Sequence, residues 1–187
     1  MLSSRDLEEF FTNSGLPDPY FIRIPDLPHL PGLEEYVEHC NFLLYEVEER
    51  VGHWCIIWYS PVEESWLFFD PYGFMLDDQL EYTYHKDMDL TEKFLEMREE
   101  NIDVNEYRYQ ADGTDTCGKI CAIRYLWDCM GYSIQDFKEI FYDDKDLDSR
   151  DILISTLYDV LNDSGKRNTN QEVEEEEEEE FDVNELD

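Results

Sequence analysis

The segment HWCIIWY at residues 53–59 constrains the fold of this chain more than any other stretch. Its apolar side chains fill both alternating positions of an extended chain, as is typical of a central strand covered on both faces. A second apolar run, residues 66–69, follows after a short turn and stops at the turn sequence Asp70-Pro71-Tyr72-Gly73. These two segments predict two central strands of a sheet.

Residues 117–130 (CGKICAIRYLWDCM) predict a buried helix. Their apolar side chains would surround almost the whole circumference of the helix, and Gly131 would end it. The sequence also predicts strands at residues 41–47 and 106–110, and helices over residues 5–13, 90–100, 134–141 and 150–161.

Serine residues would cap three of these helices: Ser3 or Ser4 the first, Ser133 and Ser149 the last two. The prolines between residues 17 and 31 predict an extended, irregular connection. Strands and helices interleave without the regular spacing of βαβ units. We therefore predict an α+β fold, in which a small mixed, largely antiparallel sheet packs on the buried helix and further helices flank it.

The chain has 187 residues, about the length of one ordinary domain, and 42% of them are hydrophobic, enough for a core. Residues 171–187 differ from the rest, since they include eleven acidic residues and no basic one. We predict one folded domain over residues 1–165 and a disordered acidic tail over residues 166–187.

The charge of the chain bears on its partners. It carries 14 basic and 48 acidic residues, a formal net charge of −34. Without the last 17 residues, 14 basic and 37 acidic residues still leave −23. A surface with this much negative charge repels nucleic acid and anionic lipid, and we therefore expect no DNA partner and no membrane partner. Basic segments of other proteins are the partners that the charge favours.

The sequence predicts a monomer inside a cell. No apolar run approaches the length of a membrane span, and Asp6, Glu8 and Glu9 stand where a signal peptide would be apolar. The five cysteines are odd in number and include no CxxC pair, which favours free thiols in a reducing compartment. We expect no metal or other cofactor.

Three chemically useful residues stand at the ends of predicted elements. His53 begins one buried strand, Asp70 follows the next, and Cys117 begins the buried helix. A thiol at a helix N-terminus is favoured as a thiolate, and a neighbouring imidazole would complete a thiolate–imidazolium pair. An aspartate would orient the imidazole ring.

Two further residues fit the same chemistry. Gln110, seven residues before Cys117, could donate from its amide to a developing oxyanion, together with the backbone N–H of Cys117. Gly118 leaves room for a substrate backbone. The alternative is structural: His53 as a core histidine, Asp70 as a turn former and Cys117 as a small buried apolar residue.

Four groups of residues follow one another in a characteristic order: Gly52-His53-Trp54, Phe69-Asp70-Pro71-Tyr72-Gly73-Phe74, Gln110, and Asp115-Thr116-Cys117-Gly118 with Cys121 one turn later. Together they resemble the adenovirus endopeptidase (adenain) family of cysteine peptidases, relatives of the Ulp-type SUMO peptidases. The resemblance covers roughly residues 1–160. It implies that Cys117 is the nucleophile, His53 the general base, Asp70 its orienting acid and Gln110 the oxyanion donor.

The resemblance also implies a substrate class. Proteases of this kind mature DNA-virus particles by cutting capsid and core precursors after small residues, often Gly-Gly or Gly-Ala. Trp54, packed beside the triad, would narrow the substrate groove, and Gly118 would leave room in it. The expected locations are the virion and the cytoplasm or nucleus of the host cell. Two alternatives stay open: an isopeptidase acting on ubiquitin-like tails, and a protease-like binding module without turnover.

The chain departs from the adenovirus enzyme at two points. The acid is Asp70 rather than a glutamate, as in the Ulp-type relatives. The adenovirus enzyme is activated by a basic peptide, disulfide-linked to a cysteine between the acid and the glutamine, but this chain has no cysteine between Cys55 and Cys117. An activating peptide is therefore possible but not indicated, and the net charge of −34 does not suit activation by DNA.

Overall fold

A five-stranded sheet forms the centre of the molecule. The computed structural model describes residues 2–29, 40–49, 51–89 and 102–183, with side chains placed except at 27–29 and 167–183. The strands are β1 (Tyr20–Arg23), β2 (Asn41–Glu48), β3 (Val51–Ser60), β4 (Ser65–Phe69) and β5 (Ile102–Val104), and they lie side by side in that order. The inner pairs, β2–β3 and β3–β4, are antiparallel, whereas β1–β2 and β4–β5 are parallel.

The predicted α+β class with a mixed sheet is therefore confirmed, and its antiparallel part comprises the three central strands. Strand β3 is covered on both faces, as predicted. Trp54, Ile56 and Trp58 pack into one hydrophobic cluster, and the alternate residues Cys55 and Ile57 pack into a second cluster on the other face.

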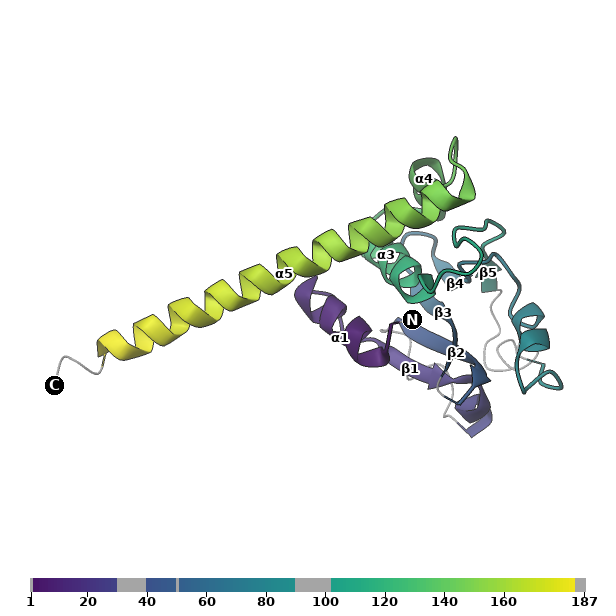
Figure 1. Ribbon diagram of the computed structural model, residues 1–187, viewed down its shortest axis with the longest axis horizontal. Helices are drawn as coiled ribbons and strands as arrows, with labels where there is room; N and C mark the ends of the chain where they lie inside the picture. The colour runs from purple at the N-terminus through teal and green to yellow at the C-terminus, as the bar shows by residue number, and fades with distance from the viewer. Residues whose placement is uncertain (1, 30–39, 50, 90–101, 184–187) are drawn as a thin grey trace.

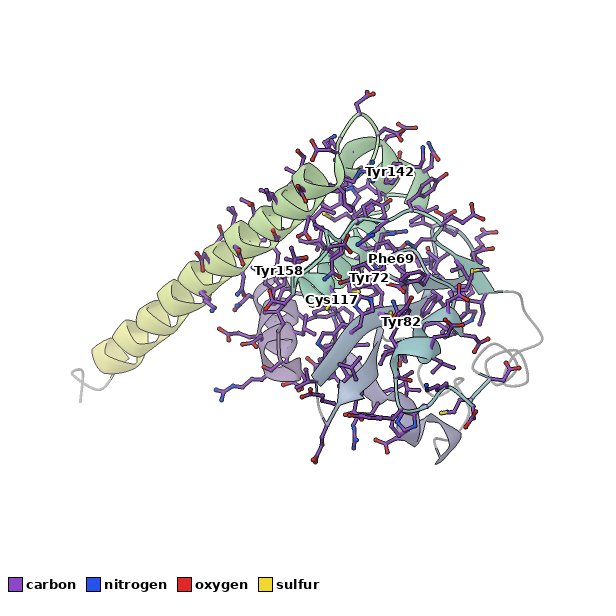
Figure 2. The ribbon with its side chains drawn as sticks, turned by 45° about the vertical axis from the view of Figure 1, so that its right-hand side comes forward. Phe69, Tyr72, Tyr82, Cys117, Tyr142 and Tyr158 are labelled. Carbon is purple, nitrogen blue, oxygen red and sulfur yellow. The ribbon has the colours of Figure 1, made fainter. Side chains whose placement is uncertain are left out.

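Helices cover one face of the sheet (Figure 1). They are α1 (Ser4–Asn13), α3 (Cys117–Cys129), α4 (Ile134–Phe141) and α5 (Leu147–Val183). Among the described residues, the opposite face is covered by the 3-10 helices η1 (Ile24–His29) and η3 (Asp78–Tyr82) and the segment around Leu76. Figure 2 shows the side chains filling the body between α5 and the sheet, with Tyr158 of α5 turned towards it.

Helix α3 is buried almost all round, as its sequence predicted. Nine of its thirteen residues are buried, and it contacts β3 on one side and α1, α4 and α5 on the others. The first helix begins where its serines predicted, because Ser3 and Asp6 form a reciprocal capping box. Ser133 and Asp136 form the same device at α4.

The strand predicted at residues 106–110 is wrong. Strand β5 lies earlier, at Ile102–Val104, and pairs with β4, which ends at Phe69. Beyond that point the described residues offer no strand to pair with, and the backbone N–H groups of Tyr109 and Gln110 both donate to the carbonyl oxygen of Pro71 instead. The predicted irregular connection contains a strand that was missed, β1, and the predicted helix over 90–100 lies outside the described residues.

The last helix differs from the prediction at both ends. It begins at Leu147, because Asp146 rather than Ser149 caps it: the Ser149 N–H and hydroxyl both donate to the Asp146 carboxylate. It continues past Leu161 to Val183 and projects from the body (Figure 1), so the acidic run for which we predicted disorder lies in helix. Glutamate is a good helix former, and no proline interrupts the run.

Within the described ranges, no helix combines the length and the apolar character needed to cross a membrane. All five cysteines are free thiols, as predicted, and all except Cys129 are buried.

Candidate active site

His53 and Asp70 meet at one end of the sheet. The antiparallel pairing of Ile56 with Phe69 places Asp70 opposite Cys55, and His53 lies two residues along on the same face of β3. The His53 Nε2 atom is 2.7 Å from Asp70 Oδ1. The predicted contact between the histidine and the aspartate is therefore present.

The Asp70 carboxylate is fully buried and fixed from several sides. Its Oδ1 also accepts from the backbone N–H of Tyr72 at 2.7 Å, and its Oδ2 accepts from Gln79 Nε2 at 2.9 Å. The Asn105 side chain holds the Asp70 backbone, accepting from its N–H at 2.7 Å and donating to its carbonyl at 2.9 Å. Such a carboxylate can hold an imidazole in one orientation and tautomer.

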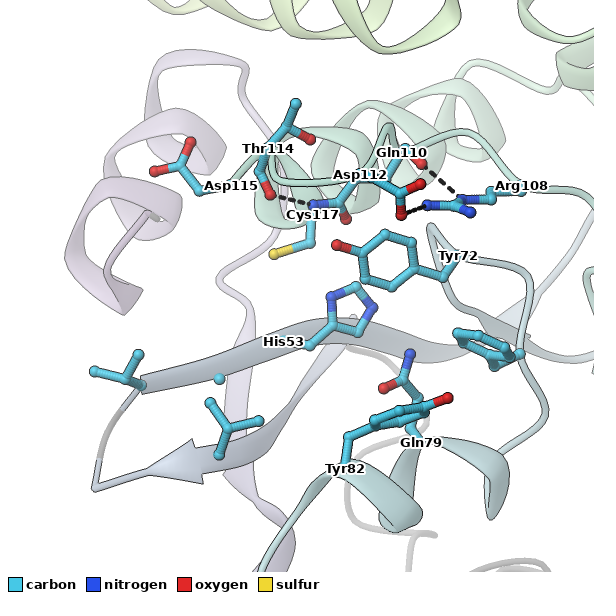
Figure 3. Close-up of a pocket in the computed structure, with 14 residues that line it drawn as sticks. His53, Tyr72, Gln79, Tyr82, Arg108, Gln110, Asp112, Thr114, Asp115 and Cys117 are labelled. Carbon is cyan, nitrogen blue, oxygen red and sulfur yellow. Dashed lines mark hydrogen bonds and ion pairs between the residues drawn. The ribbon is translucent and has the colours of Figure 1, made fainter. Parts of the chain in front are cut away.

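Cys117 faces the same histidine. Figure 3 shows Cys117 close above the His53 ring, and both residues line one cavity. Burial lowers the pKa of His53, but hydrogen bonds to Asp70 and Cys117, and the charges of both groups, outweigh it and raise this pKa to about 9. The imidazole therefore carries a proton at neutral pH when its two neighbours are in place.

Cys117 lies at the N-terminus of α3. Thr116 occupies the N-cap position, but its side chain makes no capping hydrogen bond. The Thr116 side chain therefore accepts no hydrogen bond from the backbone N–H groups of the first helical turn, which point towards the start of the helix. Cys117, the first residue of α3, is 3% exposed and lies at this end.

Gln110 is held beside Cys117 by an anchored loop. Its Nε2 donates to the Thr114 carbonyl at 2.8 Å, whereas its buried Oε1 has no hydrogen-bond partner among the described residues. The loop is fastened to α5 by the buried Asp151, which accepts from the Ala111 N–H at 2.8 Å and from the Thr114 hydroxyl at 2.6 Å. One amide hydrogen of Gln110 remains for a ligand.

The site opens on a cavity of about 540 Å³. His53, Gln110 and Cys117 form its polar centre. Figure 3 shows Tyr82 below the His53 ring. The apolar and aromatic part of the lining also includes Val47, Val51 and Phe74. The cavity is large enough to hold several residues of an extended peptide.

Trp54 and Gly118, predicted to bind substrate, lie next to this cavity but not in its lining. Trp54 is buried, and its Nε1 donates to the Leu2 carbonyl at 3.0 Å. A Cβ atom on Gly118 would lie 3.3 Å from Trp54 Cδ1 and 3.5 Å from the Leu2 side chain. Gly118 thus permits close packing of α3 on Trp54, and a role of either residue in substrate binding stays a prediction.

Three groups at the site have the chemistry of metal ligands. The donor atoms of His53, Cys55 and Asp70 lie within 4.8 Å of one another. Both oxygens of Asp70 are already hydrogen-bonded, and burial raises the pKa of Cys55 well above its usual value, which opposes the thiolate that a metal needs. This donor set suits proton transfer better than a metal ion.

Comparison with known proteins assigns no family. No protein-family model matches the chain, and no curated protein matches it significantly.

Sequence reasoning missed four residues that shape the site: Tyr72, Gln79, Asn105 and Asp151. One of them had a signal, because Asp151 stands on the apolar stripe that Ile154 and Tyr158 continue at helical spacing. An acid on a buried stripe indicates a buried polar partner. Gln79 and Asn105 lie in polar stretches with no such pattern.

Proposed function

We propose that the protein is a cysteine peptidase in which Cys117 is the nucleophile, His53 the general base and acid, Asp70 the orienting acid and Gln110 an oxyanion donor. One observation carries the proposal: the His53 ring is held by Asp70 at 2.7 Å on one side and faces Cys117, the first residue of α3, on the other. The cavity at this point, with Gln110 in its wall, supplies space for a peptide.

The reaction follows from the positions of these groups. His53 takes the proton of the Cys117 thiol, and the sulfur attacks the scissile carbonyl. A C–S bond forms and the π electrons move to the carbonyl oxygen, where the Cys117 N–H and the Gln110 amide donate to it. As the tetrahedral intermediate collapses, the C–N bond breaks and the leaving amine takes the proton from His53. His53 then deprotonates a water molecule, whose oxygen forms a bond to the thioester carbon. The C–S bond breaks, the peptide leaves as a carboxylic acid, and the sulfur takes the proton back from His53 as the thiol.

The substrate class rests on the resemblance to the adenain family. We propose protein precursors of a virus particle, cut after small residues, with the enzyme acting in the virion and in the cytoplasm or nucleus of the host cell. The net charge of −34 favours substrates with basic segments.

The test is labelling by a peptide that ends in Gly-Gly and carries a vinyl sulfone. We expect stoichiometric labelling of Cys117, none in Cys117→Ala, and at least about 1,000-fold slower labelling in His53→Ala, since nucleophile and base act as a unit. Cys129→Ala is the matched control, because Cys129 is the one exposed cysteine and should not affect labelling.

Labelling at Cys129 instead of Cys117, or labelling of Cys117 that does not need His53, would contradict the proposal. A second arm offers capsid-like precursor peptides and the Gly-Gly tail of a ubiquitin-like modifier in parallel. Turnover of the modifier tail alone would favour the isopeptidase.

A further inference from the structure

Tyr72 contacts His53, Asp70 and Arg108 at the site. Its ring stacks on the His53 ring, with centroids 4.6 Å apart and planes inclined by 21°. Its backbone N–H donates to Asp70 Oδ1 at 2.7 Å, and the Arg108 guanidinium lies 5.1 Å from the centre of its ring. Arg108 in turn donates from Nε to the carbonyl of Gln110 at 2.9 Å. Both the position and the tilt of Tyr72 are therefore fixed.

These contacts aim the hydroxyl of Tyr72 into the reaction centre. Figure 3 shows it pointing towards Cys117 and Gln110, and all three residues line the same cavity. Within the described part of the chain it makes no hydrogen bond of its own. Burial raises the pKa of Tyr72, and the charge of Cys117 raises it further, so the hydroxyl keeps its proton and remains a donor at neutral pH.

We propose that Tyr72 is a further catalytic residue. Its hydroxyl donates a hydrogen bond to the oxygen of the scissile carbonyl as that oxygen becomes an oxyanion. The inference rests on the proposed peptidase function and adds a third donor to the Cys117 N–H and the Gln110 amide. Only one amide hydrogen of Gln110 is available, because the other is donated to Thr114.

A third donor stabilises the transition state more than the ground state. A carbonyl oxygen has two lone pairs, whereas the tetrahedral oxyanion has three and a full negative charge. The third hydrogen bond is therefore completed only when the C–S bond has formed, which is the condition for lowering the barrier. Tyr72 keeps its proton throughout, and His53 alone supplies the proton of the leaving amine.

The test uses Tyr72→Phe, which keeps the ring and its stacking on His53 but removes the hydroxyl. We expect kcat/KM for a peptide to fall by about tenfold to a hundredfold, somewhat less than the loss typical of an isolated oxyanion donor. A peptide aldehyde, which forms a tetrahedral adduct with an oxyanion, should bind more weakly by a similar factor. Alkylation of Cys117 by iodoacetamide should stay within twofold, because displacement at a saturated carbon creates no oxyanion.

Two further variants separate the hydroxyl from the ring. Tyr72→Leu removes the stacking as well and should slow iodoacetamide alkylation in addition to turnover. Tyr84→Phe loses the hydroxyl of an exposed tyrosine outside the cavity lining and should change nothing. Circular dichroism would show that each variant is folded.

Turnover by Tyr72→Phe within twofold of the wild type would overturn the inference and leave the peptidase function standing. So would an equal loss in alkylation and turnover, since the hydroxyl would then act on the Cys117–His53 pair instead of the oxyanion. A wild-type protein that neither labels at Cys117 nor cleaves would overturn the peptidase function, and with it this inference.

Discussion

The two ends of one helix–strand pair hold buried charges of different kinds. At the start of β3 and α3, His53 and Cys117 face a cavity and Asp70 supports the histidine. At the far end of the same two elements, the buried Asp128 accepts from Ser60 Oγ at 2.7 Å and from Trp58 Nε1 at 3.0 Å. It also forms an ion pair of 3.5 Å with Arg124, which is fully buried.

The two ends differ in whether a ligand can reach the buried carboxylate's partner, and in whether that partner is an arginine or a histidine. Arg124 keeps its proton in proteins and is enclosed by the rings of Trp58 and Phe137, so its pair with Asp128 can only stabilise structure. His53, with its pKa raised to about 9, can give up its proton to a bound ligand and borders a cavity. A buried carboxylate becomes part of a candidate site only when its partner can exchange a proton with a ligand.

The largest effect on stability is expected at the end of β3 and α3 where Asp128 and Arg124 are enclosed. Asp128→Ala leaves the Arg124 charge buried without its carboxylate, so the free energy of unfolding should fall by about 3–5 kcal/mol in urea titrations. The double variant Asp128→Leu with Arg124→Met should recover most of this loss, because apolar side chains then fill the space. A loss below about 1 kcal/mol for Asp128→Ala would contradict the buried ion pair.

The His53–Asp70 pair, at the end that borders the cavity, should make the free energy of unfolding depend on pH. The pKa of His53 is about 9 in the folded protein, above the usual 6.5, so its protonated form stabilises the fold. This contribution, roughly 1–3 kcal/mol, is fully present below pH 6.5 and is lost as pH rises through about 9. Unfolding of wild type and His53→Gln at pH 6, 8 and 9.5 measures it: their difference should shrink with rising pH, and a constant difference would argue against the shift.

A smaller effect comes from removing one hydrogen bond to each carboxylate. Gln79→Met frees Asp70 Oδ2 and should lower kcat/KM by about tenfold, equivalent to about 1.4 kcal/mol, because His53 is held less firmly. Ser60→Ala, the matched change at Asp128, should cost about 1 kcal/mol of stability and leave kcat/KM unchanged. The comparison fails if both variants lose activity equally.

The smallest effect is expected from the acidic part of α5, which lies away from both ends of β3 and α3. Truncation after Asn168 removes the acidic part of α5 and should leave kcat/KM for a small peptide within twofold. The ion pair between Lys166 and Glu9, 2.8 Å long, is retained in this variant. A large loss of turnover would mean that the acidic run takes part in catalysis.

The sequence predicted the parts of the fold that periodicity encodes. Residues 53–59, apolar on both faces, and the all-round apolar helix from Cys117 correctly predicted a central strand and a buried helix. The histidine–aspartate contact followed from the start of the 53–59 strand and the end of the 66–69 strand. The strand predicted at residues 106–110 was wrong because a segment becomes a strand only where a neighbouring strand offers unpaired backbone N–H and C=O groups. The local sequence does not encode the presence of such a neighbour. Gln79 and Asn105 reach Asp70 through tertiary contacts alone.

The length of α5 determines what its acidic run can do. At 1.5 Å per residue, Glu174 lies about 12 Å and Val183 about 25 Å beyond Lys166 along the helix axis. The Debye length in physiological salt is about 8 Å, so most of this charge is screened from the reaction centre. Its influence falls on encounter: a positively charged partner would meet the projecting helix first, and added salt would slow its capture without changing the chemical step that follows.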